Sequence, residues 1–400
     1  GSHLSRSSTS SSVATVIFFF SVQRLLRTTL FPYTTLFRSG AYAGDDAAGP
    51  APGLPPIKSE EVSRGMATVS QNPETERLEV ELKPLWEMTT TPSRIAPGHG
   101  ACPGCGFFPM IRQAYNVLEG NVVVLFQTGC AMVTTTGYPK TAHRITYIHN
   151  LFQNGAATLS GLVEMYHERI RRGEIPTPAD GEDTTFIMVT GDGGMDIGMG
   201  AALGTAARNH RMIILEYDNQ GYMNTGSQLS YSTPYGHRTS TSEVGGKLSG
   251  KRFHHKDTPQ IFAACNLPYV FTASEGYPED FMRKISKAQW YAKNEGLVYG
   301  KVLSFCPLNW RTKDDAAQEV LQTAIDCCFF PLYEVEKGHT QITYDPDAIG
   351  RRRTVGAWLG QMGKTKHMLA AKNTDRLEII ELEVEKRWQR LKIKSEHPEL

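Results

Sequence analysis

Two short patterns in the sequence carry side chains suited to cofactor chemistry. The stretch Thr190–Gly226 closes one apolar run with Gly191-Asp192-Gly193 and closes the next with a turn that carries Asn219. Aspartate and asparagine offer the hard oxygen ligands that Mg²⁺ prefers. A glycine-flanked turn that opens a helix offers free N–H groups to a phosphate, but a carboxylate there would repel it unless a cation lay between them. The pair therefore predicts a Mg²⁺-diphosphate site, with a purely structural turn as the alternative.

The second pattern is ACPGCG, which contains Cys102 and Cys105 just before a predicted helix, whose N-terminus favours thiolates. The chain has seven cysteines, and an odd number in a chain of this length does not indicate a disulfide framework. We therefore expect a reducing, cytoplasmic location, where Cys-x-x-Cys is typical of a metal site or a redox pair. A structural zinc site is one alternative, although zinc ribbons usually carry two such pairs and this chain has one.

The elements that must position these residues alternate between strands and helices. Near-continuous apolar runs predict strands at 121–127, 144–149, 185–190, 211–217, 269–273 and 298–305. Helical patterns lie between them at 107–118, 156–172, 197–208 and 279–294. This alternation predicts an α/β fold with a mostly parallel sheet of about six strands and helices on both faces.

The polar and sulfur-containing side chains follow these strands. Ligands of open parallel sheets bind beyond the carboxyl ends of the strands. The residues that directly follow the predicted strands include Cys130, Phe152, Asn154, Asp192, Asn219 and Cys306. Because the carboxyl ends meet at one edge of the sheet, the sequence predicts a single site that combines thiols with amide and carboxylate groups.

The ends of the chain differ from this central pattern. Thr29–Ser39, TLFPYTTLFRS, resembles a translated sequencing adapter, so residues 1–39 are interpreted as an assembly artefact that is disordered. Residues 40–91 are predicted to be a linker and N-terminal extension, because their first part is rich in proline, glycine and alanine. Residues 347–400 are predicted to be a helical tail with an amphipathic helix at 375–394. Its apolar face could pack on its own domain or on a partner subunit.

Composition excludes two classes of partner. The chain of 400 residues has a formal net charge of +1, which gives no electrostatic argument for binding nucleic acid or an anionic membrane. No apolar run reaches the roughly 18 residues that span a bilayer. We therefore expect a globular protein that binds neither nucleic acid nor membrane.

The two patterns together resemble a known family. GDG with a downstream asparagine is similar to the thiamine-diphosphate motif, and DNQGYMNTGSQLSYSTP at Asp218–Pro234 resembles the β-type subunit of the 2-oxoacid:ferredoxin oxidoreductases, closest to the pyruvate branch. Aryl-glyoxylate members share this style of sequence. The resemblance extends over residues 92–346, which we therefore expect to form one domain that binds thiamine diphosphate and an iron–sulfur cluster.

The resemblance implies two sets of ligands. Asp192, Asn219 and the carbonyl of Gly221 would bind Mg²⁺ of thiamine diphosphate. Four matching cysteines would hold a [4Fe–4S] cluster, whose four irons need four thiolates; they are Cys102, Cys105, Cys130 and Cys306. The residues expected to line the cofactor site are Gly129, Cys130, Phe152, Asn154, Gly191, Asp192, Gly193, Asn219, Gly221, Tyr222, Asn224 and Thr225. Asn224 is the catalytic candidate, since it matches a position that faces the reacting 2-oxo group.

The implied activity is oxidative decarboxylation of a 2-oxoacid, with pyruvate leading, to acyl-CoA and CO₂. Electrons would pass through the cluster to ferredoxin or a similar carrier. No glutamate here matches the one that activates thiamine, which this family places on a pyrimidine-binding α-type subunit, so a β subunit that works with α-type, γ-type and ferredoxin-like δ subunits is expected. Three alternatives stay open: a non-oxidative decarboxylase or carboligase with structural zinc, an aryl-glyoxylate oxidoreductase subunit, and a non-catalytic scaffold subunit.

Overall fold

The structure is a computed structural model that describes residues 66–87, 92–137, 140–179 and 183–397. The segment interpreted as an artefact, 1–39, lies outside the described residues, as does most of the expected linker. The described part of that linker contains an antiparallel hairpin of β1 (Ala67–Gln71) and β2 (Leu78–Leu82). The hairpin packs against helix α8 (Pro278–Asn294).

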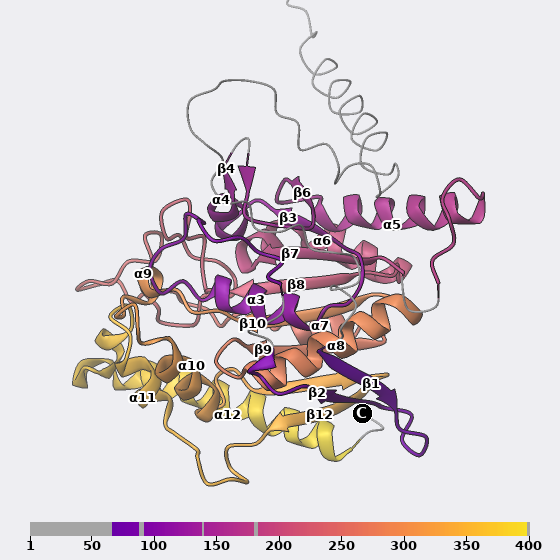
Figure 1. Cartoon of the computed structure of the whole chain (residues 1–400). Helices are drawn as coiled ribbons and strands as arrows, with labels where there is room; N and C mark the ends of the chain where they lie inside the picture. The colour runs from indigo at the N-terminus through magenta and orange to yellow at the C-terminus, as the bar shows by residue number, and fades with distance from the viewer. Residues whose placement is uncertain (1–65, 88–91, 138–139, 180–182, 398–400) are drawn as a thin grey trace, which may run out of the picture. The chain divides into compact units, whose positions relative to one another are not determined.

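One sheet organises the chain from β3 onward (Figure 1). Its eight strands in spatial order are β12 (His339–Tyr344), β11 (Leu332–Glu336), β9 (Tyr269–Ser274), β10 (Val298–Leu303), β8 (Ile213–Asp218), β7 (Thr185–Gly191), β3 (Val122–Gln127) and β6 (Thr146–Asn150). The six strands from β9 to β6 are parallel to one another and coincide with the six predicted runs. The α/β prediction is confirmed.

The predicted strand count was two short. Strands β11 and β12 pair with each other, and β11 pairs antiparallel with β9. Their sequence carries charges that a buried strand seldom has, yet Glu334 and Glu336 are buried. The ammonium of Lys287, on α8, lies 2.7 Å and 3.2 Å from these two carboxylates and neutralises them. This compensation comes from another element, so the hydrophobic pattern of the strands alone does not reveal it.

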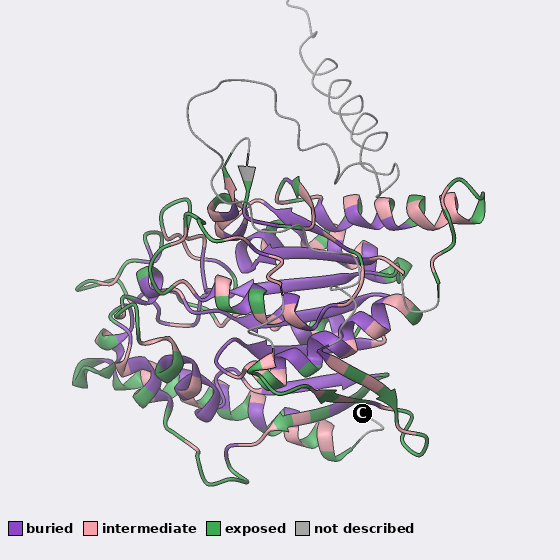
Figure 2. Cartoon of the chain, viewed as in Figure 1, coloured by how far each residue is buried: buried purple, intermediate pink, exposed green. Residues whose placement is uncertain are grey.

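The sheet separates two hydrophobic clusters, because successive side chains of a strand point to opposite faces. Val124 and Ile187 pack with α3 (Phe107–Val117) and α8, whereas Leu125 and Met188 pack on the other face. The helices on that second face are α5 (Gly155–Arg171), α6 (Asp192–Arg208), α7 (Thr258–Ala263), α10 (Ala317–Asp326) and α12 (Thr374–Glu396). Figure 2 shows the strands buried between these layers. The prediction of helices on both faces is confirmed.

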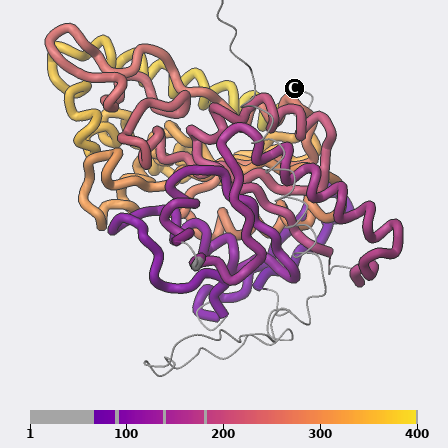
Figure 3. Tube along the Cα trace, turned by 90° about the horizontal axis from the view of Figure 1, so that it is seen from above, coloured from indigo at the N-terminus to yellow at the C-terminus, as the bar shows by residue number. Residues whose placement is uncertain are grey.

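The C-terminal helix α12 packs on its own chain. Four side chains of α12 are buried in the hydrophobic cluster on the second face of the sheet, namely Ile380, Val384, Trp388 and Leu391. The helix also contacts β12. In the view from above, the yellow C-terminal segment and the purple segment that follows residue 92 lie on opposite sides of the fold (Figure 3). The apolar face expected for either its own domain or a partner is thus used within the chain.

Shorter elements complete the chain. They are α4 (Cys130–Thr135), β4 (Thr136–Gly137), β5 (Lys140–Thr141), α9 (Pro307–Trp310), α11 (Val355–Gly360) and the 3₁₀ turns η2 (Lys366–Leu369) and η3 (Ala371–Asn373). Among the described helices, none has both the length and the apolar character needed to span a bilayer.

Candidate active site

The carboxyl ends of the parallel strands form a pocket from the residues that the sequence singled out. It contains eleven of the twelve residues expected to line the cofactor site, namely Gly129, Cys130, Phe152, Gly191, Asp192, Gly193, Asn219, Gly221, Tyr222, Asn224 and Thr225. Asn154 is the exception: it precedes α5, and its side-chain oxygen is buried without a hydrogen-bond partner. The pocket also includes Thr128, Gly194, Tyr217 and Met223, which were not among the residues expected to line the cofactor site.

The pocket is a shallow shelf in this chain. It encloses about 30 Å³, whereas pockets that engulf an organic ligand enclose roughly 300–1,000 Å³. The described residues alone therefore do not enclose a ligand of the size of an organic cofactor.

Three oxygen atoms converge at the centre of this shelf. The side-chain oxygen of Asn219 lies 3.0 Å from the carbonyl oxygen of Gly221 and 3.1 Å from Oδ1 of Asp192. All three atoms are acceptors, so either the amide of Asn219 turns over to donate its N–H groups or a cation lies between them. Octahedral Mg²⁺ holds its ligands at roughly 2.1 Å, so neighbouring ligands lie roughly 3 Å apart. The two distances from the Asn219 oxygen match this spacing.

Asp192 lacks a cation beside its Oδ1 among the described residues. It is 1% exposed, and burial raises the pKa of its carboxyl well above the usual value, with a further contribution from Asp218. The Ser230 hydroxyl donates to Oδ2 at 2.5 Å. Lys256 donates to the backbone carbonyl of Asp192 at 3.0 Å and pairs with the Asp196 carboxylate instead. A bound cation would therefore favour the ionised form of Asp192, which burial disfavours.

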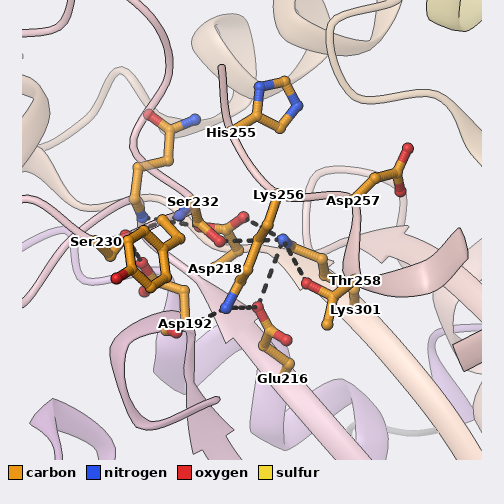
Figure 4. A network of polar contacts seen from close by, with 12 residues as sticks. Asp192, Glu216, Asp218, Ser230, Ser232, His255, Lys256, Asp257, Thr258 and Lys301 are labelled. Atoms are coloured by element: carbon orange, nitrogen blue, oxygen red, sulfur yellow. Dashed lines mark hydrogen bonds and ion pairs between the residues drawn. The ribbon is translucent and has the colours of Figure 1, made fainter. Parts of the chain in front are cut away.

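A buried charge network supports the turn that carries Asn219 (Figure 4). Lys301 lies 2.9 Å from Asp218 and 3.4 Å from Glu216. The other carboxylate oxygen of Asp218 accepts the backbone N–H of Gln220 at 2.9 Å. Because both partners of Asp218 are fixed, the network holds the turn between β8 and the pocket in one conformation.

Gly193 allows an aromatic ring to approach the first turn of α6. A Cβ at this position would lie 2.4 Å from the Tyr222 ring, closer than any side-chain contact permits. The Tyr222 hydroxyl in turn donates to Asp196 at 3.5 Å. The small residue in the motif therefore has a packing reason as well as its expected place beside a diphosphate.

The cysteines expected to bind a cluster come from three segments that hydrogen bonds tie together. Cys102 and Cys105 lie in the loop before α3, Cys130 begins α4, and Cys306 precedes α9. The N–H of residue 106 donates to the carbonyl of residue 305 at 2.9 Å, and the N–H of residue 100 donates to the carbonyl of residue 134 at 2.8 Å. The loop of the first pair thus joins both other segments.

The environment of the thiols suits ligation. Burial, with a smaller contribution from the nearby cysteines, raises the pKa of Cys105 and of Cys130 to about 12. Backbone N–H groups face the sulfur atoms of Cys105, Cys130 and Cys306. Such donors stabilise thiolates and tune iron–sulfur clusters. In the described parts of the chain, no group of three or more His, Cys, Asp or Glu side chains is already arranged around a metal position.

Asn309 and Trp310, at the end of α9, connect the segment of Cys306 to the turn that carries Asn219. The Asn309 side chain donates to the carbonyl of Asn219 at 2.7 Å, and the Trp310 indole N–H donates to the same oxygen at 3.2 Å. From the C-terminal segment, Lys364 donates to the side chain of Gln220 at 2.8 Å. Burial lowers the pKa of Lys364 to about 7. Sequence reasoning missed all three, and only the NW pair three residues after Cys306 offered a signal.

Glu275 is a further residue that the sequence did not single out. It is buried, and burial raises the pKa of its carboxyl to about 8. One oxygen accepts the N–H of Phe305 at 2.6 Å, while the other has no partner among the described residues. A Cβ at Gly106 would lie 2.0 Å from this carboxylate. Glu275 therefore packs between the loop of Cys105 and the segment of Cys306.

Comparisons with known proteins agree with this geometry. Residues 128–299 match the family "Thiamine pyrophosphate enzyme, C-terminal TPP binding domain", which supports thiamine diphosphate as the cofactor. Residues 128–299 thus form a domain of the thiamine-diphosphate-binding type.

Individual relatives narrow the class. The chain is 39% identical over 276 residues to the pyruvate synthase subunit PorB of Methanocaldococcus jannaschii, covering 68% of this chain and 89% of that protein. It is 39% identical to PorB of Thermotoga maritima over 74% of this chain and 90% of that protein. It is 31% identical to the ketoisovalerate oxidoreductase subunit VorB of Pyrococcus abyssi over 74% and 91%, respectively. A solved 2-oxoglutarate:ferredoxin oxidoreductase of Magnetococcus marinus aligns with a TM-score of 0.43 at 20% identity, covering 57% of this chain and 79% of that chain.

The chain belongs to the family of β subunits of the 2-oxoacid:ferredoxin oxidoreductases. This membership confirms the resemblance inferred from the sequence. It favours the oxidoreductase over the non-oxidative decarboxylase and the scaffold subunit that the sequence left open.

Proposed function

We propose that this chain is the β subunit of a pyruvate:ferredoxin oxidoreductase, which converts pyruvate and coenzyme A to acetyl-CoA and CO₂. The observation that carries the proposal is the meeting of the Asp192–Asn219–Gly221 oxygen triangle with four cysteines at one edge of the sheet. The names of the PorB relatives support pyruvate. The VorB relative makes a branched 2-oxoacid the second candidate, with an aryl glyoxylate behind it.

The oxygen triangle would hold Mg²⁺ against the cofactor's diphosphate, and the N-terminus of α6 would offer its free N–H groups to the same anion. When bound, thiamine diphosphate supplies the electron sink that decarboxylation requires. Asn224 and Thr225 place polar groups in the pocket, and we assign Asn224 to orienting the 2-oxo group. The Thr225 hydroxyl donates to Gln228 at 2.7 Å, which fixes this segment.

The four cysteines, Cys102, Cys105, Cys130 and Cys306, would hold a [4Fe–4S] cluster, which accepts electrons one at a time when bound. The backbone N–H of Asn224 faces the sulfur of Cys130, so one segment touches both the cofactor shelf and the cluster ligands. Short separation between the two centres is what single-electron oxidation of a cofactor adduct needs.

The open side of the shelf would be closed by a partner. The small enclosed volume supports an α-type subunit that supplies the opposite wall and the activating glutamate. The assembled enzyme would include γ-type and ferredoxin-like δ subunits, would pass electrons to ferredoxin or a similar carrier, and would be cytoplasmic.

The test is purification of the full complex without oxygen, followed by visible and electron paramagnetic resonance spectra before and after reduction. The expected result is bleaching on reduction, with the signal of one [4Fe–4S] centre lost in Cys306→Ser while the signals of the ferredoxin-like subunit remain. Iron–sulfur signals that are unchanged in Cys306→Ser, together with one zinc per copy of this chain, would overturn the cluster assignment. Substrate choice is read from kcat/KM on pyruvate, 2-oxoisovalerate and phenylglyoxylate, and a preference for either of the last two would overturn pyruvate.

A further inference from the structure

A second and much larger cavity lies behind the cofactor shelf. Its volume is 370 Å³, within the roughly 300–1,000 Å³ range of small-molecule sites. It is bounded by α12, by the start of α7 and by the segment 329–333 that leads into β11. None of the residues expected to bind thiamine diphosphate or the cluster lines it.

Cations outnumber carboxylates in the lining of this cavity, which contains Lys256, Lys301, Arg387, Arg390 and Lys394 together with Asp218, Asp257 and Glu383. Arg387, Arg390 and Lys394 follow one another along one side of α12. Arg387 is already engaged, since it donates to His255 and to Glu383. Arg390 makes no hydrogen bond or ion pair with any described residue, and Lys394 has only a 2.7 Å hydrogen bond to the neutral side chain of Gln260. Two cations at the entrance therefore lack anionic partners.

The walls of the cavity are aromatic. Phe329, Phe330 and Tyr333 line it, and Phe329 is held by stacking on Trp358 with ring centroids 4.1 Å apart. The Tyr333 hydroxyl accepts a hydrogen bond from Gln260 at 2.9 Å. Rigid aromatic walls offer stacking surfaces to a planar ring.

The floor of the cavity is polar and belongs to the network drawn in Figure 4. Asp218, Ser232, Lys256 and Lys301 reach it, and Lys301 donates to the Ser232 hydroxyl at 3.1 Å. These groups offer both donors and acceptors to the hydroxyl groups of a ligand.

We propose that this cavity binds a nucleoside phosphate. Phosphate oxygens would meet Arg390 and Lys394 at the mouth, since guanidinium groups bind phosphate through two parallel hydrogen bonds. The base would lie against the aromatic walls, and the sugar hydroxyls would face the polar floor. The volume exceeds what a 2-oxoacid needs, which argues against a second substrate molecule as the occupant.

The test is calorimetric titration of the full chain with ADP, with adenosine and inorganic phosphate as separate probes. ADP should bind at least tenfold more tightly than either part. Arg390→Glu and Lys394→Glu should each weaken ADP binding at least tenfold, while Lys386→Glu, on an exposed position of the same helix that does not line the cavity, should leave it unchanged.

ADP also carries a diphosphate, so its binding in the cavity must be distinguished from binding at the cofactor shelf. In Asp192→Asn the shelf loses its carboxylate while the cavity keeps all of its lining, so ADP affinity should stay the same. Loss of ADP binding in that variant, equal binding in Lys394→Glu and wild type, or no binding of ADP at all would each overturn the proposal. The result is independent of whether the chain binds thiamine diphosphate.

Discussion

Replacement of Asp192 by asparagine should change the stability of the cofactor-free and cofactor-bound protein in opposite directions. Without a cation, the Asp192 carboxylate is buried and its Oδ1 lies 3.1 Å from the side-chain oxygen of Asn219, another acceptor. An amide at this position is neutral and can donate to that oxygen. Relief of an unsatisfied buried polar group is worth about 1–3 kcal/mol, so the cofactor-free variant should be more stable than wild type.

The stability that Asp192→Asn gains over the wild type should increase with pH. Burial raises the pKa of Asp192 in the folded state, so the native protein holds a proton that the unfolded chain releases. The stability linked to this carboxyl is therefore complete below its unfolded pKa and is lost as the pH rises through the folded pKa. The advantage of Asp192→Asn should be larger at pH 8 than at pH 5.

In the presence of Mg²⁺ and thiamine diphosphate, the wild type should be more stable than Asp192→Asn. A ligand present at 100 times its Kd stabilises a protein by about 2.7 kcal/mol, which for a chain of this size is a Tm increase of ~3 °C. Loss of one charged partner at a buried contact costs roughly 2–5 kcal/mol, or about 30-fold or more in Kd. Asp192→Asn should therefore lose most of the Tm increase caused by Mg²⁺ and thiamine diphosphate.

The assay is thermal unfolding of the full chain, purified without oxygen, at pH 5 and pH 8 with and without Mg²⁺ and thiamine diphosphate. Asp315→Asn, at an exposed aspartate that does not line the pocket, is the matched control. The reasoning is refuted if Asp192→Asn keeps the cofactor-dependent Tm increase, or if its cofactor-free form is less stable than wild type at pH 8.

Three further outcomes are expected. In a titration with the cofactor, Gly193→Ala should bind at least tenfold more weakly, because its Cβ would contact the Tyr222 ring. The double variant Gly193→Ala, Tyr222→Leu should recover most of this loss. Burial lowers the pKa of His143 to about 4. The free energy of unfolding of the wild type should therefore fall by about 1.4 kcal/mol for each pH unit as the pH is lowered from 6.5 to 4. Urea unfolding should show that the free energy of unfolding of His143→Phe depends less steeply on pH. Trp388→Ala should cost about 3–5 kcal/mol in urea unfolding, since the side chain is fully buried; a loss below 1 kcal/mol would show that α12 is only loosely attached.

The sequence by itself determined the parallel core of the sheet and most of the cofactor shelf. Runs such as 185–190 and 211–217 are apolar enough to be buried on both faces, and the turns after them are set by local residues. Once these strands are parallel, their carboxyl ends must share an edge. The sequence alone therefore predicts that Asp192 and Asn219 lie close together. Asn154, which does not line the pocket, shows that a position in a neighbouring loop is less constrained.

Only the tertiary structure decided how the site is supported. The buried charges of β11 have their counter-ion on α8, and the Asn219 carbonyl has its donors ninety or so residues further along the chain, as Asn309 and Trp310. The second cavity exists because α12 folds back over α7 and the segment before β11. Hydrophobic periodicity records which face of an element is buried, but it does not record which distant polar group compensates a buried charge. That pairing depends on distances between elements, which the fold alone sets.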